Sequence, residues 1–146
     1  MRVVLSVGIV FFAIYSTALA QQPVRWSYRA QHLQDGSFRI LIHAKMTKGW
    51  HIYTVDQPKG AVSIPTSVTF KKNPLLRMEG ELKSEGPVEN DSYNDQVTFS
   101  QTVKVVANVK VQVVGEVNFM ACDDHECLPP ITLPFQLLLN PGSDNR

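Results

Sequence analysis

FRILIHAK, residues 38–45, is the stretch that decides the fold class. Its apolar side chains take every second position, at Phe38, Ile40, Ile42 and Ala44. Side chains two residues apart point to the same face of a strand, so this spacing predicts a β-strand with one buried face.

The same period returns along the chain, and little in it favours helices. Other β-rich runs are residues 67–71, 97–106, 111–119 and 131–139. Turn residues such as Asp-Gly, Asn-Pro and Gly-Pro separate the runs. We therefore predict an all-β, antiparallel β-sandwich or barrel of seven or eight short strands.

Two stretches interrupt the β pattern, residues 55–65 and 83–94. Long loops on a rigid sandwich often carry function, so both are candidate parts of a site.

The first twenty residues differ from the rest. Met1-Arg2 precedes an apolar run of about 13 residues, too short to span a bilayer, and Ala18 and Ala20 follow in the A-x-A positions. We predict a cleaved signal peptide over residues 1–20 and a single exported domain over residues 21–146, with no later membrane span.

The charge of the predicted mature chain excludes one class of partner. Without Arg2 it has 13 basic and 13 acidic residues, so its formal net charge is zero. No basic excess is available to bind phosphate backbones, and nucleic acid is not an expected partner.

The candidate chemistry lies in residues 118–130, NFMACDDHECLPP. Cys122 and Cys127 are the chain's two cysteines, and the apolar runs on both sides predict that they flank a hairpin tip. In an exported protein such a pair is able to close as a disulfide. A bridge over so short a loop adds only roughly 2 kcal/mol in the chain-entropy model, so a structural staple and a redox pair both remain open.

Two further interpretations use the same segment. Met120, Cys122, His125 and Cys127 offer soft ligands suited to Cu(I) or zinc. Alternatively, the domain is a non-catalytic binding module with a structural disulfide.

Acidic residues surround the pair, at Asp123, Asp124 and Glu126. Nearby negative charge disfavours a thiolate, so a reduced pair here is expected to react slowly until a partner docks. Alternatively, these carboxylates only keep a turn soluble.

An aromatic segment, residues 49–53 or GWHIY, is the second notable element. In a strand, Trp50 and Ile52 face one side and His51 and Tyr53 the other. We expect one face in the core and the other near the cysteines.

The chain resembles the N-terminal periplasmic domain of the DsbD thiol:disulfide interchange proteins. Three segments carry the resemblance: GWHIY, VTFSQ (residues 97–101) and FMACDDHECLPP (residues 119–130). The resemblance covers about Val24 to Leu139. It implies an immunoglobulin-like β-sandwich, a periplasmic location and no cofactor or resident metal. It also implies a component of a protein-disulfide reductase, which receives electrons from a membrane or thioredoxin-like domain and gives them to thioredoxin-fold proteins.

The resemblance also assigns roles to residues. Cys122 and Cys127 are the redox pair, Cys127 is the cysteine that forms mixed disulfides, and Tyr53 is an aromatic neighbour of the site. His51 takes the place of a tyrosine found in some members. A histidine there either shares a proton with a cysteine or only packs, and packing is favoured. The cysteine spacing is one residue shorter than in some members.

Two departures concern the surroundings of the pair. Family members have a loop whose aromatic residue caps the disulfide, and in the corresponding stretch, residues 85–93, only Tyr93 is available. Full members continue into a membrane domain and a thioredoxin domain, so we expect a stand-alone homologue whose electron donor is on another chain.

Overall fold

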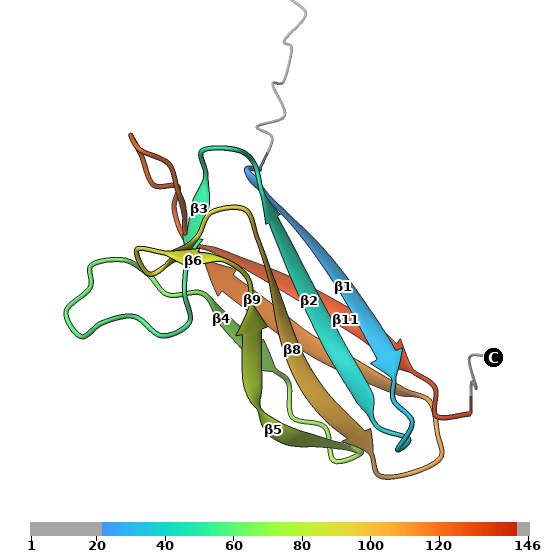
Figure 1. Cartoon of the computed structure of the whole chain (residues 1–146). Coiled ribbons are helices and arrows are strands. Elements are labelled where there is room, and N and C mark those ends of the chain that lie inside the picture. Colours follow the sequence, from blue (N-terminus) through green and yellow to red (C-terminus); the bar gives the residue numbers. More distant parts are fainter. Residues whose placement is uncertain (1–21, 143–146) are drawn as a thin grey trace, which may run out of the picture.

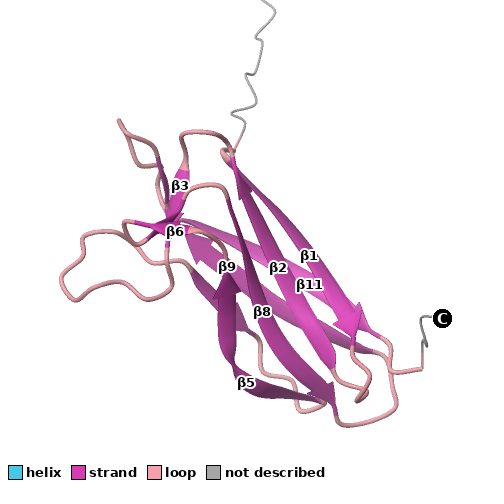
Figure 2. Ribbon diagram, viewed as in Figure 1, coloured by secondary structure: helices cyan, strands magenta, loops and turns pink. Residues whose placement is uncertain are grey.

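The computed structural model describes residues 22–142, which form eleven β-strands and no helix (Figures 1 and 2). The predicted signal peptide lies outside these residues. No helix long and apolar enough to cross a membrane occurs between residues 22 and 142. The strands are β1 (Val24–His32), β2 (Phe38–Met46), β3 (His51–Tyr53), β4 (Ser67–Phe70), β5 (Leu76–Glu85), β6 (Val88–Glu89), β7 (Ser92–Tyr93), β8 (Gln96–Val105), β9 (Val111–Phe119), β10 (Ala121–Cys122) and β11 (Ile131–Leu139).

Two antiparallel sheets make up the body of the sandwich. One has the strand order β1-β2-β8-β5 and the other β11-β9-β4. The FRILIHAK segment forms most of β2, and its four alternating apolar residues are all buried. The predicted all-β, immunoglobulin-like antiparallel sandwich is therefore confirmed.

Aromatic side chains fill the space between the sheets. The Trp26 ring from β1 lies 6.2 Å from that of Phe99 and 5.0 Å from that of Phe119. Tyr28 stacks on Phe135 of the second sheet at 4.9 Å. Burying rings of this size supplies a large share of the hydrophobic stabilisation, since each removes much apolar area from water.

Close packing also explains a glycine in the middle of β9. A Cβ atom at Gly115 would lie 2.5 Å from Cζ of Phe135 and 2.5 Å from the carbonyl oxygen of Thr69. A side chain at position 115 would therefore push apart strands on both sides of β9.

The strand count exceeds the prediction because of short strands and one long exposed strand. Four strands have only two or three residues, and β5 is ten residues long but mostly exposed. Its charged residues take every second position, but Gly80 and Ser84 interrupt the apolar positions between them, and the strand has no β-branched residue. The expectation that residues 83–94 lie outside the β pattern is wrong in part, because β5 continues to Glu85 and β6 and β7 form a small hairpin.

A third small sheet, with the order β10-β3-β7-β6, lies at one end of the sandwich. Figure 1 shows this end at the upper left, where the hairpin after β10 and the loop after β3 project together. That loop, residues 54–66, contains no strand, as predicted. The small sheet brings the cysteine segment and the aromatic segment to the same place.

Candidate functional site

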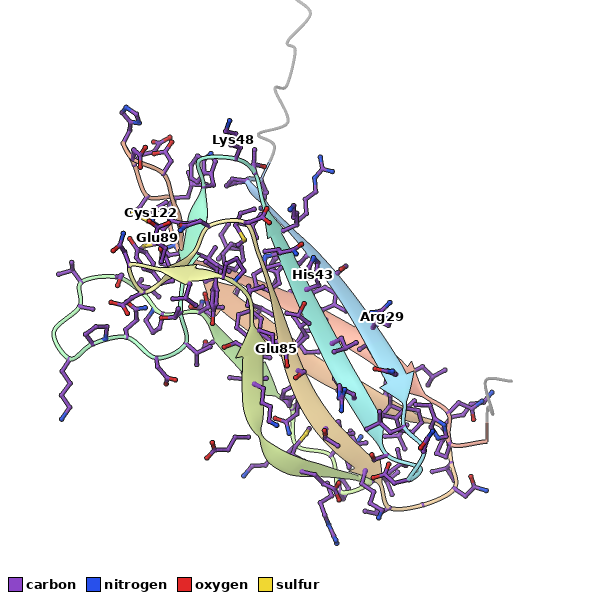
Figure 3. All side chains as sticks on the ribbon, in the orientation of Figure 1. Arg29, His43, Lys48, Glu85, Glu89 and Cys122 are labelled. Carbon is purple, nitrogen blue, oxygen red and sulfur yellow. A yellow bond between two sulfur atoms is a disulfide. The ribbon has the colours of Figure 1, made fainter. Side chains whose placement is uncertain are left out.

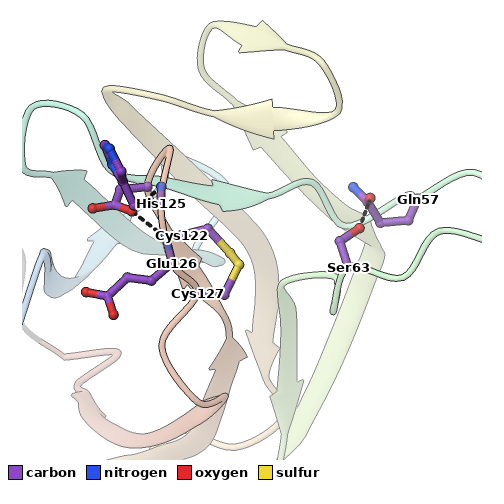
Figure 4. The surroundings of a disulfide bond; sticks show 7 residues. Gln57, Ser63, Cys122, His125, Glu126 and Cys127 are labelled. Atoms are coloured by element: carbon purple, nitrogen blue, oxygen red, sulfur yellow. Dashed lines mark hydrogen bonds between the residues drawn. A yellow bond between two sulfur atoms is a disulfide. The ribbon is translucent and has the colours of Figure 1, made fainter.

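The cysteine pair lies at the base of a tight hairpin, as predicted (Figure 4). The amide of Asp123 donates to the carbonyl of Glu126 at 2.9 Å, and the amide of Leu128 donates to the carbonyl of Ala121 at 2.8 Å. Cys122 and Cys127 lie directly opposite one another between these two hydrogen bonds, with 4.0 Å between their Cα atoms. Their sulfur atoms form a disulfide of 2.05 Å.

The Asp123 carboxylate holds the hairpin turn. Its Oδ1 atom accepts hydrogen bonds from the amides of Glu126 and His125, each at 2.8 Å. These two bonds, assisted by the charges of His125 and His51, lower the pKa of Asp123 below its ordinary value. Asp123 therefore stays ionised and shapes the turn as well as adding negative charge.

The other turn residues face solvent. Asp124, His125 and Glu126 are exposed, and Met120 before the hairpin is half-buried. Among residues 22–142, no group of three or more His, Cys, Asp and Glu side chains is arranged to hold a metal ion.

The two cysteines differ sharply in accessibility. Cys122 is only 1% exposed, whereas Cys127 belongs to the exposed residues of the hairpin. An incoming thiolate approaches a disulfide along the S–S axis and needs access to the sulfur that it attacks. Access from solvent therefore favours attack at Cys127.

His51 lies on the other side of Cys122. In the β10–β3 pair the register sets Cys122 opposite His51 and Ala121 opposite Ile52. Opposed residues of antiparallel strands share a face. His51, Cys122 and Cys127 therefore form a row across three neighbouring chain segments, with the buried cysteine in the middle.

The aromatic segment has the alternation that its sequence predicts. Ile52 is completely buried and faces the core, while His51 and Tyr53 are half-buried on the outer face. The rings of His51 and Tyr53 meet edge to face with centroids 5.3 Å apart. Trp50 is half-buried and packs against the core.

A hollow of about 450 Å³ opens beside this row. Figure 3 shows Glu89 and Cys122 together at this end of the molecule, with Lys48 nearby. Two carboxylates and two amides are among its lining side chains, and neither lysine nor arginine contributes. The lining residues are Gly49, Trp50, His51, Tyr53, Glu89, Asn90, Ser92, Asn94 and Asp124.

Sequence analysis missed the contribution of β6 and β7 to this hollow. Their turn carries Asn90 and Asp91 with φ of 50° and 56°. Asn and Asp adopt this left-handed conformation more readily than most residues, so the Asn-Asp pair was the available signal for a two-residue hairpin turn.

Tyr93 lies in the core. Its side chain is 2% exposed, its ring meets Phe99 edge to face, and its hydroxyl donates to Ser84 Oγ at 2.8 Å. In the β3–β7 pair it lies opposite Ile52, on the core face. In this position the Tyr93 ring does not form an aromatic cap over the disulfide.

The loop of residues 54–66 is joined to the β6–β7 turn by a side-chain hydrogen bond. Ser63 Oγ donates to Gln57 Oε1 at 2.8 Å, and Gln57 Nε2 donates to the carbonyl of Asp91 at 2.9 Å. Figure 4 shows Gln57 and Ser63 on the side toward which the disulfide projects. Val62 in this loop is fully exposed.

Comparison with known proteins gives one family match. Residues 17–139 match the family described as "Thiol:disulfide interchange protein DsbD, N-terminal". No curated protein matches the chain in sequence.

Two solved structures are similar to the chain. The Neisseria meningitidis DsbD N-terminal domain in the reduced form has 11% sequence identity and a TM-score of 0.42, over 79% of this chain and 86% of that one. The GAE domain of yeast GGA1 has 10% identity and a TM-score of 0.45, over 82% and 96%.

Proposed function

Because this chain belongs to the family of the DsbD N-terminal domain, we propose that Cys122 and Cys127 pass electrons to other proteins by thiol–disulfide exchange. The family carries out thiol:disulfide interchange, and the chain supplies one disulfide for it. The observation that carries the proposal is the asymmetry of that disulfide, which has one exposed and one buried sulfur.

The asymmetry suggests an order of events. In the reduced protein, the Cys127 thiolate attacks a partner's disulfide, and the partner's second sulfur leaves as a thiolate. Cys122 then attacks Cys127 Sγ and breaks its bond to the partner. The partner gains two electrons and becomes a dithiol, while Cys122 and Cys127 become a disulfide.

The acidic hairpin suits a reduced cysteine pair that reacts slowly until its partner docks. The carboxylates of Asp123, Asp124 and Glu126 oppose a nearby thiolate charge and so slow reaction with stray oxidants. A partner that covers the hairpin and brings positive charge would relieve this repulsion.

The partners that we propose follow the family. The acceptor is a periplasmic protein of the thioredoxin fold, and the donor is a membrane domain of DsbD type or a thioredoxin-like domain. The protein would meet both after export through the predicted signal peptide.

Trapping tests the proposal directly. In the Cys122→Ser variant, Cys127 keeps its thiol but the resolving cysteine is lost, so an oxidised thioredoxin-fold protein should remain attached as a mixed disulfide. Cys127→Ser is the matched control and should retain almost none. The complexes are measured on non-reducing gels and by mass spectrometry.

A structural disulfide predicts the opposite behaviour. If excess dithiothreitol does not reduce the Cys122–Cys127 bond in the folded protein, the bond is a structural disulfide and the proposal fails. The domain would then be a binding module, in which loss of the disulfide lowers the melting temperature without affecting partner binding.

A further inference from the structure

We propose that His51 accepts the proton of the Cys122 thiol when Cys122 resolves a mixed disulfide, and returns it in the reverse reaction. This inference rests on the proposed function and assigns a step within it. It concerns the buried cysteine and is independent of the first attack by Cys127.

The register places His51 directly beside Cys122. His51 is the cross-strand partner of Cys122 in the β3–β10 pair, and Cys122 is the partner of Cys127 in the hairpin. Directly opposed side chains in antiparallel strands have Cβ atoms roughly 4.5–5.5 Å apart. Cys122 thus has its target sulfur on one side and an imidazole on the other.

The surroundings of Cys122 explain why it needs a proton acceptor. Its side chain is 1% exposed, so water has little access to its thiol. Burial and nearby carboxylates both disfavour a free thiolate. Among residues 22–142 there is no helix whose N-terminus could stabilise the charge, and no Lys or Arg lines the adjoining hollow.

Several titratable groups surround His51. They are Tyr53 on β3, Cys122 on β10, Glu89 on β6, and Asp123 and Asp124 in the hairpin turn. Among them, His51 is the group that offers a ring nitrogen on the face that it shares with Cys122.

The proton and the electron pair of the Cys122 thiol go to different atoms. The Cys122 S–H bond breaks, its proton goes to a ring nitrogen of His51, and its electron pair forms the bond to Cys127 Sγ. The bond between Cys127 and the partner breaks, and the partner's sulfur leaves as a thiolate. In the reverse direction, a donor thiolate attacks Cys127, and the imidazolium protonates the departing Cys122 sulfur.

The competing role for His51 is packing against Tyr53. A phenylalanine at position 51 would keep an aromatic ring there but could not take up a proton. His51→Phe therefore separates proton transfer from packing. His51→Gln is a second variant, in case the phenylalanine disturbs folding.

The experiment uses stopped-flow absorbance with the reduced protein and 5,5′-dithiobis(2-nitrobenzoate). Attack by Cys127 releases one thionitrobenzoate at a rate that depends on reagent concentration. Closure of the ring by Cys122 releases a second, and its rate does not depend on that concentration. The two phases are recorded from pH 5.5 to 8.5, and His43→Gln, on the outer face of β2, is the control.

Wild-type protein should show a second phase whose rate depends on pH less steeply than in the His51 variants. In His51→Phe and His51→Gln the second phase should slow at least tenfold at pH 7, since general-base catalysis typically contributes about 10²–10⁴-fold, and its rate should then rise about tenfold per pH unit. The first phase should change less than twofold. His43→Gln should match the wild type in both phases.

A second phase within twofold of the wild type at every pH, in either folded His51 variant, would overturn this inference while leaving the proposed function intact. If the wild type itself releases only one thionitrobenzoate, the pair does not close and the proposed function fails. The two failures are therefore distinguishable in one experiment.

Discussion

Cys122 and Cys127 are joined by one disulfide, yet the Cys122 side chain is 1% exposed and Cys127 lies on the exposed side of the hairpin. The difference arises from their neighbours. Cys122 is covered on its β3 side by the strand that carries His51, whereas Cys127 is on the returning segment, which has no further strand beyond it. The reactivity of the two thiols should follow this geometry.

We expect iodoacetamide to alkylate Cys127 of the reduced, folded protein at least tenfold faster than Cys122, because alkylation requires an accessible thiolate. The rates are measured by quenching at intervals and mass spectrometry of the cysteine peptides. The same measurement in urea is the control, since unfolding should make the rates similar. Equal rates in the folded protein would contradict the predicted roles of the two cysteines.

Reduction of the disulfide should leave the domain folded. The bridge closes a very short loop, so its loss should lower the free energy of unfolding by only about 2 kcal/mol. The hydrogen bonds on both sides of the pair, from Asp123 and Leu128, do not depend on the sulfurs. Urea unfolding with and without a reductant measures the difference, and cooperative unfolding on reduction alone would refute the prediction.

The Asp123 carboxylate should stabilise the hairpin only while it is ionised. Because its pKa is lowered in the folded state, its stabilisation is present above the ordinary aspartate value of 3.8 and is lost as the pH falls through the folded value. Asp123→Ala should therefore lower the melting temperature at pH 6, and this difference should shrink below pH 3. Asp124→Ala, in the same turn, is the control. A difference independent of pH would show that ionisation plays no part.

Substitution of Gly115 tests the packing of the two sheets. An alanine Cβ would lie 2.5 Å from both Phe135 and the Thr69 backbone, so Gly115→Ala should destabilise the domain by roughly 1–3 kcal/mol. Gly142→Ala should change stability by less than about 0.5 kcal/mol, because its nearest neighbour would lie 3.8 Å away. Urea unfolding measures both, and equal effects would argue against the close approach at β9.

The β6–β7 turn offers a stabilising substitution. Asp91 has φ of 56°, and glycine adopts such angles without the cost of a Cβ atom. Asp91→Gly should therefore raise the free energy of unfolding by roughly 0.5–1 kcal/mol. Asp91→Val should lower it, because a β-branched residue resists this conformation. If thermal or urea unfolding shows that the Asp91→Val variant is more stable than the Asp91→Gly variant, the turn geometry is wrong.

Much of the sandwich was predictable because its strands bury one face. The alternation in β2 and the β-branched runs in β8 and β9 follow directly from this arrangement. β5 was not predictable in the same way, since most of its side chains face solvent and Gly80 and Ser84 interrupt the apolar positions opposite its charged face. The two-residue strands β6 and β7 are too short to show any period and depend on their turn and on β3.

The site was predictable in its residues but not in its arrangement. Spacing and flanking runs indicated a hairpin carrying the cysteine pair. The register that sets His51 beside Cys122 joins segments about seventy positions apart, and no local pattern encodes it. The same holds for Tyr93, whose place in the core results from pairing with Ile52.

One backbone carbonyl, that of Asp91, links the loop after β3 to the β6–β7 turn. The Asp91 oxygen accepts hydrogen bonds from the Thr54 amide, the Thr54 hydroxyl and the Gln57 side chain. The loop after β3 and the β6–β7 turn are thus joined through the Asp91 carbonyl. Mutations in the two segments should consequently show epistasis, with double variants departing from the sum of the single effects on partner affinity.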